Sequence, residues 1–109
     1  MPYPKEESLE FNYFIRKGNL RNDRSNFMTW FRNLKEFLYQ KNISYVIEEL
    51  LGDAPGNSAS VEAKEDFRQR REIWRSVQIT MYVCMDHEQK NEFRHMEPIV
   101  MIDALKIQF

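Results

Sequence analysis

The chain is poor in the residues that build loop-rich or covalently stabilised folds. Of its 109 residues only three are Gly, four are Pro and one is Cys. So few turn-forming residues argue against a β-sandwich, which needs a tight turn every few residues. The single Cys84 excludes an internal disulfide, and with it the disulfide-stabilised class of small secreted proteins.

Long apolar runs and an excess of charge of one sign are also missing. No apolar run approaches the roughly 20 residues needed to cross a bilayer. Sixteen basic and seventeen acidic residues leave a net charge of −1, which gives no whole-molecule field for nucleic acid or an anionic membrane. Residues 1–7 are acidic and contain proline, unlike a signal or transit peptide. We therefore expect a cytoplasmic protein with no membrane partner.

Core-forming side chains, in contrast, are abundant: 42% of the residues are hydrophobic, with eight Phe and two Trp. The length is that of one domain. Residues 1–19 are expected to form an amino-terminal arm or a short packed segment, because residues 9–16 fit both a short helix and an extended strand-like segment. Residues 20–109 are expected to form a helical domain.

Apolar residues recur at helical spacing from residue 27 to residue 38, which predicts a helix from about Asn26 to Gln40. Either Ser25 or Asn26 is placed to cap its first turn through a side-chain oxygen. A short second helix is predicted over residues 44–51. A loop is predicted at residues 52–59, where Gly, Asp, Pro, Asn and Ser gather.

Three further helices are predicted in the second half of the chain. Ser60 can cap a long helix that runs to about Cys84. Asp86 opens the next one, because Asp-x-x-Gln at residues 86–89 resembles a capping box. Pro98 is suited to the first turn of the last, where its missing N–H is not needed.

These patterns predict an all-α fold, a compact bundle of about five helices. The residues expected to form its core share helical spacing on the first and third helices. They are Phe27, Trp30, Leu34, Phe37, Leu38, Phe67, Trp74, Val77 and Met81.

The last helix is apolar on nearly every side, so it is either central to the core or half of a larger packing unit. If it pairs with another subunit, the residues available for self-association are Ile99, Val100, Ile102, Ile107 and Phe109.

The sequence offers little for catalysis or metal binding. Cys84, His87 and His95 lack a fourth ligand of the usual zinc type nearby, and Cys84 lies on an apolar stripe. No nucleophile–base motif and no glycine-rich phosphate loop is present. We expect no enzyme activity, no catalytic, metal-binding or cofactor-binding residues, no cofactor and no small-molecule substrate.

A basic stripe at helical spacing leaves two interpretations open. Lys64, Arg68, Arg71 and Arg75 could contact phosphates or an acidic partner. Acidic residues are interleaved with them at i, i+3 and i, i+4 spacing, which favours a solvated face whose charges pair with one another.

Three phrases resemble the Gag polypeptide of plant copia-type LTR retrotransposons. They are NFMTWFRNLKEFL at residues 26–38, YVIEE at residues 45–49 and LGDAP at residues 51–55. The closing segment LKIQF at residues 105–109 also matches the family pattern, and the resemblance covers about residues 20–109. Leu50 departs from it, because the family phrase usually has Pro there. The second capsid part and the zinc knuckle of that family do not lie in these 109 residues, so RNA packaging through a knuckle is not carried over.

The resemblance implies a capsid amino-terminal domain that self-associates in a retrotransposon particle. The implied partner is a second copy or another Gag or capsid protein. A different hypothesis is a truncated or host-domesticated Gag-derived module that binds Gag or a viral protein and interferes with assembly. A weaker one is nucleic-acid binding through the basic stripe.

Overall fold

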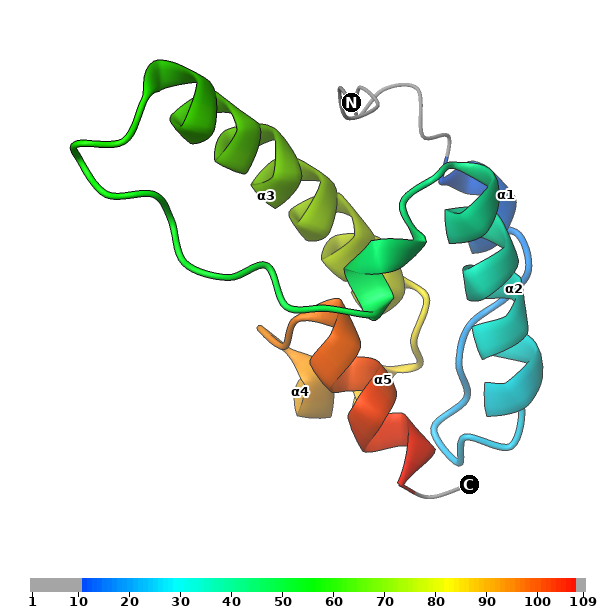
Figure 1. Ribbon diagram of the computed structural model, residues 1–109. Helices are drawn as coiled ribbons and strands as arrows, with labels where there is room; N and C mark the ends of the chain where they lie inside the picture. Colours follow the sequence, from blue (N-terminus) through cyan, green and yellow to red (C-terminus); the bar gives the residue numbers. More distant parts are fainter. Residues whose placement is uncertain (1–10, 108–109) are drawn as a thin grey trace.

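The computed structural model describes residues 11–107, and its regular structure is helical (Figure 1). The described part of the chain contains no strand, and a single parallel bridge joins Leu20 to Met85. The fold class is therefore all-α, as the sequence predicted. In chain order the helices are α1 (Asn12–Ile15), α2 (Phe27–Gln40), the 3₁₀ helix η2 (Ser44–Ile47), α3 (Val61–Val83), α4 (His87–Phe93) and α5 (Pro98–Lys106).

Helix α2 is amphipathic, and its apolar face is buried. It ends where Asn42 takes a φ of 61°, a left-handed conformation that Asn tolerates better than most residues. The predicted cap is wrong: Asn26 occupies the cap position without capping the helix. Its side chain instead accepts from the Arg21 N–H (2.9 Å) and donates to the Asn19 carbonyl (2.8 Å), so it orders the preceding loop.

The second predicted helix is also wrong in extent. Only the 3₁₀ helix η2 forms, and residues 48–60 have no helix. Val46 lies in the core and Tyr45 packs against Trp74 (ring centroids 5.3 Å), but Glu48, Glu49 and Leu50 are exposed. Beyond Ile47 only Leu51 of this segment packs against the core, and a helix that short is not stable without a continuous apolar face to bury.

Helix α3 begins where predicted, because the Ser60 hydroxyl accepts from the Ala63 N–H (3.1 Å). Its carboxyl half packs on α4 and α5, whereas its amino half projects beyond them, with the 48–60 loop running out to its tip (Figure 1). Phe67 lies on this projecting half. It is therefore only half-buried, which corrects its assignment to the core.

Helix α4 follows Asp86, which takes the cap position but makes no side-chain capping bond. The expected capping box is absent because Gln89 is buried and turned toward the α1–α2 loop. There its Nε2 donates to the Asn22 carbonyl (2.7 Å). Pro98 stands in the first turn of α5, as predicted.

The α1–α2 loop is fastened to α4 by Arg24, which is only 5% exposed. Its Nε donates to the Gln89 side-chain oxygen (2.6 Å), and its Nη2 forms an ion pair with Glu92 (2.5 Å). The guanidinium carbon lies 5.1 Å from the centroid of the Phe93 ring. Arg24 also takes a φ of 60°, so its backbone is held in a conformation that costs energy.

One core joins all of these helices. Both tryptophans are buried in it, and Phe14 brings α1 onto α2 with its ring 5.7 Å from that of Trp30. Of the residues predicted to form the core, those that are buried are Phe27, Trp30, Leu34, Phe37, Leu38, Trp74, Val77 and Met81.

Candidate interaction surfaces

The basic stripe on α3 is paired at its centre. Arg68 donates to Glu65 (2.9 Å from Nε) and to Glu72 (2.6 Å from Nη1), one helical turn away on either side. Hydrogen bonds from Arg68 and then Gln69 lower the pKa of Glu65 to about 2, and the two carboxylates raise the pKa of Arg68. Arg68 is therefore neutralised within its own helix, so the stripe is not a continuous run of cations open to phosphates.

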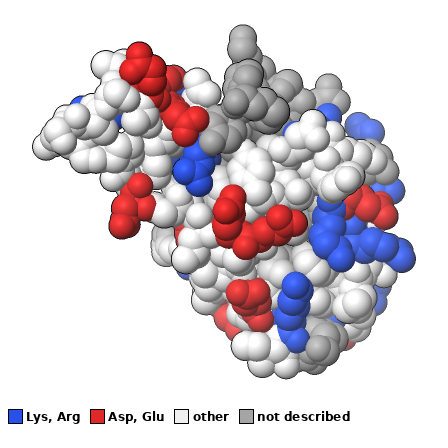
Figure 2. All heavy atoms as spheres, viewed as in Figure 1, with Lys and Arg blue, Asp and Glu red and all other residues white. Residues whose placement is uncertain are grey.

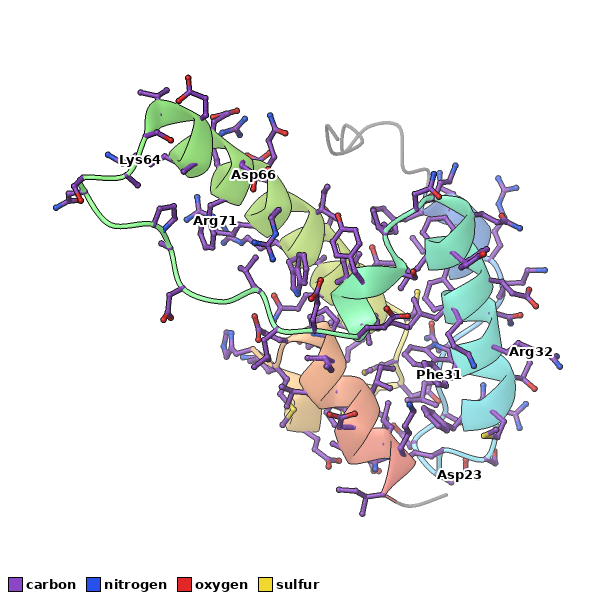
Figure 3. The ribbon with its side chains drawn as sticks, in the orientation of Figure 1. Asp23, Phe31, Arg32, Lys64, Asp66 and Arg71 are labelled. Carbon is purple, nitrogen blue, oxygen red and sulfur yellow. The ribbon has the colours of Figure 1, made fainter. Side chains whose placement is uncertain are left out.

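The other cations of the stripe have different surroundings. Lys64 donates to the Asn57 carbonyl (2.8 Å) and so fastens the loop to the helix. Arg71 and Arg75 are exposed and form no ion pair with any residue between 11 and 107. Figure 3 places Lys64 and Arg71 on the loop side of α3 and Asp66 on its other side. The ion-pair cluster around Arg68 divides the stripe. The stripe is therefore neither a continuous cationic surface nor a face on which every cation is paired.

The apolar α5 helix is only partly covered by the rest of the molecule. Val100 is 40% exposed and Ile107 85% exposed, while Ile99 is half-buried. Ile102 is fully buried, so its assignment to a self-association surface is wrong: it packs inward with Met101 and Leu105. Phe109 lies outside the described residues. The exposed apolar part of α5 is therefore Val100 and Ile107, with Ile99 beside them.

Cys84 and the two histidines do not come together as a metal site. Cys84 is buried, and burial raises the pKa of its thiol to about 11. Its carbonyl accepts from the Trp30 indole N–H (3.0 Å) and from the Leu20 N–H (2.8 Å), whereas His87 and His95 are exposed. Residues 11–107 contain no group of three or more His, Cys, Asp or Glu side chains placed to hold a metal ion. Cys84 serves as a core residue in this fold.

An open groove of about 290 Å³ lies between α3 and the α4–α5 turn. Met101 lies at its buried side, and the exposed Ile79 continues it along α3. Arg94 and His95 contribute to its polar lining. No Ser, Thr or Cys is among the residues that line the groove. These are Gln78, Ile79, Tyr82, Phe93, Arg94, His95 and Met101. Such a groove can bind an apolar or acidic segment.

Charge is divided unevenly along the chain, which the net charge of −1 does not reveal. Residues 11–47 carry seven cations against two acids, a net charge of +5, whereas residues 48–107 carry eight cations against twelve acids, a net charge of −4. Figure 2 shows basic side chains over the flank formed by α2 and acidic ones over the 48–60 loop and α3. Counting charge by segment instead of over the whole chain would have revealed this division from the sequence.

None of the described helices combines the length and the apolar character that a membrane span requires. Comparison of the chain with protein-family models, with curated proteins and with solved structures finds no match.

Proposed function

We propose that this chain is a capsid-like domain of the copia-type Gag kind, which self-associates in the cytoplasm and contributes to the assembly of a retrotransposon particle. In this proposal it acts by its shape and its contacts, without catalysis, cofactor or small-molecule substrate. Its partner is a second copy or another Gag or capsid protein.

The sequence phrases that resemble Gag support this proposal because they supply buried residues of the fold. The phrase at residues 26–38 forms α2 and supplies six buried side chains, and the phrase at residues 45–49 begins in η2, whose Val46 is buried. These phrases thus specify the packing of an all-α domain, and a family that shares them is expected to share that packing.

The observation that carries the proposal is the apolar surface that α5 leaves outside the core. Ile107 is 85% exposed and would gain roughly 1.5–3 kcal/mol on full burial, whereas Val100, which is 40% exposed, would gain a smaller amount. In an assembly of identical subunits, a small apolar contact repeated by symmetry is enough to hold neighbouring copies together.

Sedimentation velocity over a wide range of protein concentration tests the proposal. The expected result is a concentration-dependent increase in mass that the double variant Val100→Ser/Ile107→Ser reduces. Val61→Ser is the matched control, because Val61 is 80% exposed at the tip of α3, away from α5. A monomer at every concentration would contradict the proposal, and so would equal association in the double variant and the wild type.

A further inference from the structure

The division of charge places a basic surface on the first half of the fold. Arg16, Arg21, Arg32 and Lys35 are exposed and Lys41 is half-buried, while Asp23 and Glu36 are the acids in this half. We call these five cations the basic face. Arg24 does not belong to it, because its guanidinium is buried and paired with Glu92.

Aromatic contacts extend the basic face toward α5. The Lys35 ammonium lies 4.6 Å from the centroid of the Phe31 ring, and the Lys106 ammonium lies 5.1 Å from the same ring. Phe31 therefore holds two cations over the same ring. In Figure 3, Arg32 points outward from α2 on the side away from Phe31.

The opposite charge gathers on the projecting part of the molecule, residues 48–72, which we call the acidic arm. Between Lys41 and Lys64 the sequence has no cation, and the arm as a whole has seven acids against four cations, a net charge of −3. The carboxylates that are exposed and outside the Arg68 cluster are Glu48, Glu49, Asp53, Glu62 and Asp66.

The cations of the acidic arm are largely engaged within it. Lys64 donates to the Asn57 carbonyl, Arg68 pairs with two carboxylates, and Arg70 donates to the Leu51 carbonyl (3.3 Å). Arg70 also lies over the Trp74 ring at 5.3 Å. Arg71 is the cation of the arm that stays exposed without an ion pair among residues 11–107, and the arm keeps its net charge of −3.

The two surfaces meet only at the base of the arm, where Glu48 lines the same pocket as Lys35, and the rest of the arm projects away from the basic face. The longest axis measures 47 Å, and Figure 3 places Arg32 on one flank and Asp66 on the projecting helix at the other. A single copy cannot bring Asp66 on the projecting end of the arm to Arg32 on the basic face. We propose that the basic face of one copy binds the acidic arm of the next, in a head-to-tail contact that rests on the proposed function of self-association.

A second copy suits these surfaces better than a phosphate polymer. The acidic arm and the net charge of −1 repel a polyanion, whereas a neighbouring copy neutralises the basic face and the arm at once. Because the two contacting surfaces differ, the interface is heterologous and propagates into a ring or a filament. This contact is separate from the apolar α5 surface, so each subunit has two ways to meet its neighbours.

A charge exchange tests the head-to-tail contact. The basic-face variant is Arg16→Glu/Arg32→Glu, and the acidic-arm variant is Asp53→Lys/Asp66→Lys; all four positions are exposed. The matched control is Arg75→Glu/Arg94→Glu, which changes the net charge as much as the basic-face variant but lies outside both surfaces. Circular dichroism verifies that each variant keeps its helices.

We expect each variant alone to associate about tenfold more weakly than the wild type, because like charges then face each other. An equimolar mixture of the two variants should restore association. The basic-face variant keeps an unmodified acidic arm, which can bind the unmodified basic face of the acidic-arm variant. The control should associate like the wild type. Association of the wild type should also weaken as the Debye length falls from about 10 Å at 0.1 M salt to about 3 Å at 1 M.

Several results would overturn the contact. Failure of the mixture to restore association, or unchanged association in either variant, contradicts it. Loss of polyuridylate binding by the basic-face variant with unchanged self-association would assign the face to nucleic acid instead. If the charge variants associate normally while Val100→Ser/Ile107→Ser does not, the head-to-tail contact fails and the proposed function stands. A wild type that stays monomeric removes both.

Discussion

The two long connections of this fold have similar compositions but very different attachments. Residues 16–26 join α1 to α2, and residues 48–60 join η2 to α3; both contain Gly, Asn, Asp and Ser. In the first, the side chains of Asn19, Asn22 and Arg24 all reach residues 86–92. In the second, the attachments come mostly from α3, through Lys64 and Arg70.

The difference shows that the reach of loop side chains, more than turn composition, decides whether a loop joins the core. Across a gap Asn can donate and accept and Arg can donate, and the first connection also forms the Leu20–Met85 bridge and buries Leu20. In the second connection the bound groups are the backbone carbonyls of Leu51 and Asn57, which accept from side chains of α3. The second connection therefore follows α3 outward and forms one side of the acidic arm.

The largest effect is expected from the core next to the first connection. Replacing Trp30 by Ala should lower the free energy of unfolding by about 3–5 kcal/mol, because a large buried side chain is removed and a cavity remains. Trp74→Ala should cost a similar amount. Chemical denaturation followed by circular dichroism measures both.

The milder substitution to Phe separates the two tryptophans. The Trp30 indole donates to the Cys84 carbonyl, whereas the buried Trp74 Nε1 has no acceptor among residues 11–107. Trp30→Phe should therefore be more destabilising than Trp74→Phe by about 1–3 kcal/mol. Equal effects would show that the hydrogen bond from Trp30 to the Cys84 carbonyl contributes nothing to stability.

The next effect concerns Arg24, which fastens the first connection to α4. Arg24→Ala should destabilise the fold by about 2–4 kcal/mol, because the buried Gln89 oxygen loses its donor, while the half-exposed Glu92 regains water. Thermal or urea unfolding measures the change. Arg24→Gly should be less destabilising than Arg24→Ala, because Gly adopts the φ of 60° without strain. The reverse order would mean that the backbone conformation is not strained.

A smaller effect is expected in the second connection. Arg70→Ala removes one partly buried hydrogen bond to the Leu51 carbonyl and should cost about 1 kcal/mol or less. Amide hydrogen exchange should increase in residues 51–60 and remain unchanged in α2. Gln69→Ala, one position away on α3, is the control. Faster exchange throughout α2 in the Arg70 variant would show that the second connection is not attached independently of the first half of the fold.

The smallest effect is a pH dependence confined to the acidic arm. The pKa of Glu65 is lowered from 4.5 to about 2 by Arg68 and Gln69, so the folded state favours its ionised form. Its stabilising contribution is present above pH 4.5 and is lost as the pH falls through about 2. Carboxyl chemical shifts recorded by NMR should show this midpoint, and Arg68→Ala should return it toward 4.5. An unchanged midpoint in that variant would exclude the ion pair as its cause.

The sequence predicts the helices whose apolar spacing is long and regular. Both α2 and α3 extend over the predicted residues because their burial patterns repeat over several turns, and Pro98 and Ser60 mark helix starts through purely local chemistry. The extent of η2 could not be predicted, because it depends on whether the core extends beyond Val46. The roles of Asn26 and Gln89 were missed for the same reason: both side chains bind residues outside their own helix.

For the candidate surfaces, the sequence was informative about residue type and less so about exposure. It identified the cations of α3 but could not show that Arg68 takes two partners. It identified the apolar α5 helix but placed Ile102 on the outside, because a helix that is apolar on every side does not reveal which side faces the core. The basic face was visible in the sequence and was hidden only by averaging over the whole chain.

The burial of Cys84 has a practical consequence. Its thiol is both enclosed and held protonated by a pKa of about 11, so an alkylating reagent at neutral pH can react only after the core opens. As the sole cysteine, it makes the unmodified protein a built-in reporter of opening. The rate of labelling with iodoacetamide would measure how often the core around Cys84 opens, without any introduced probe.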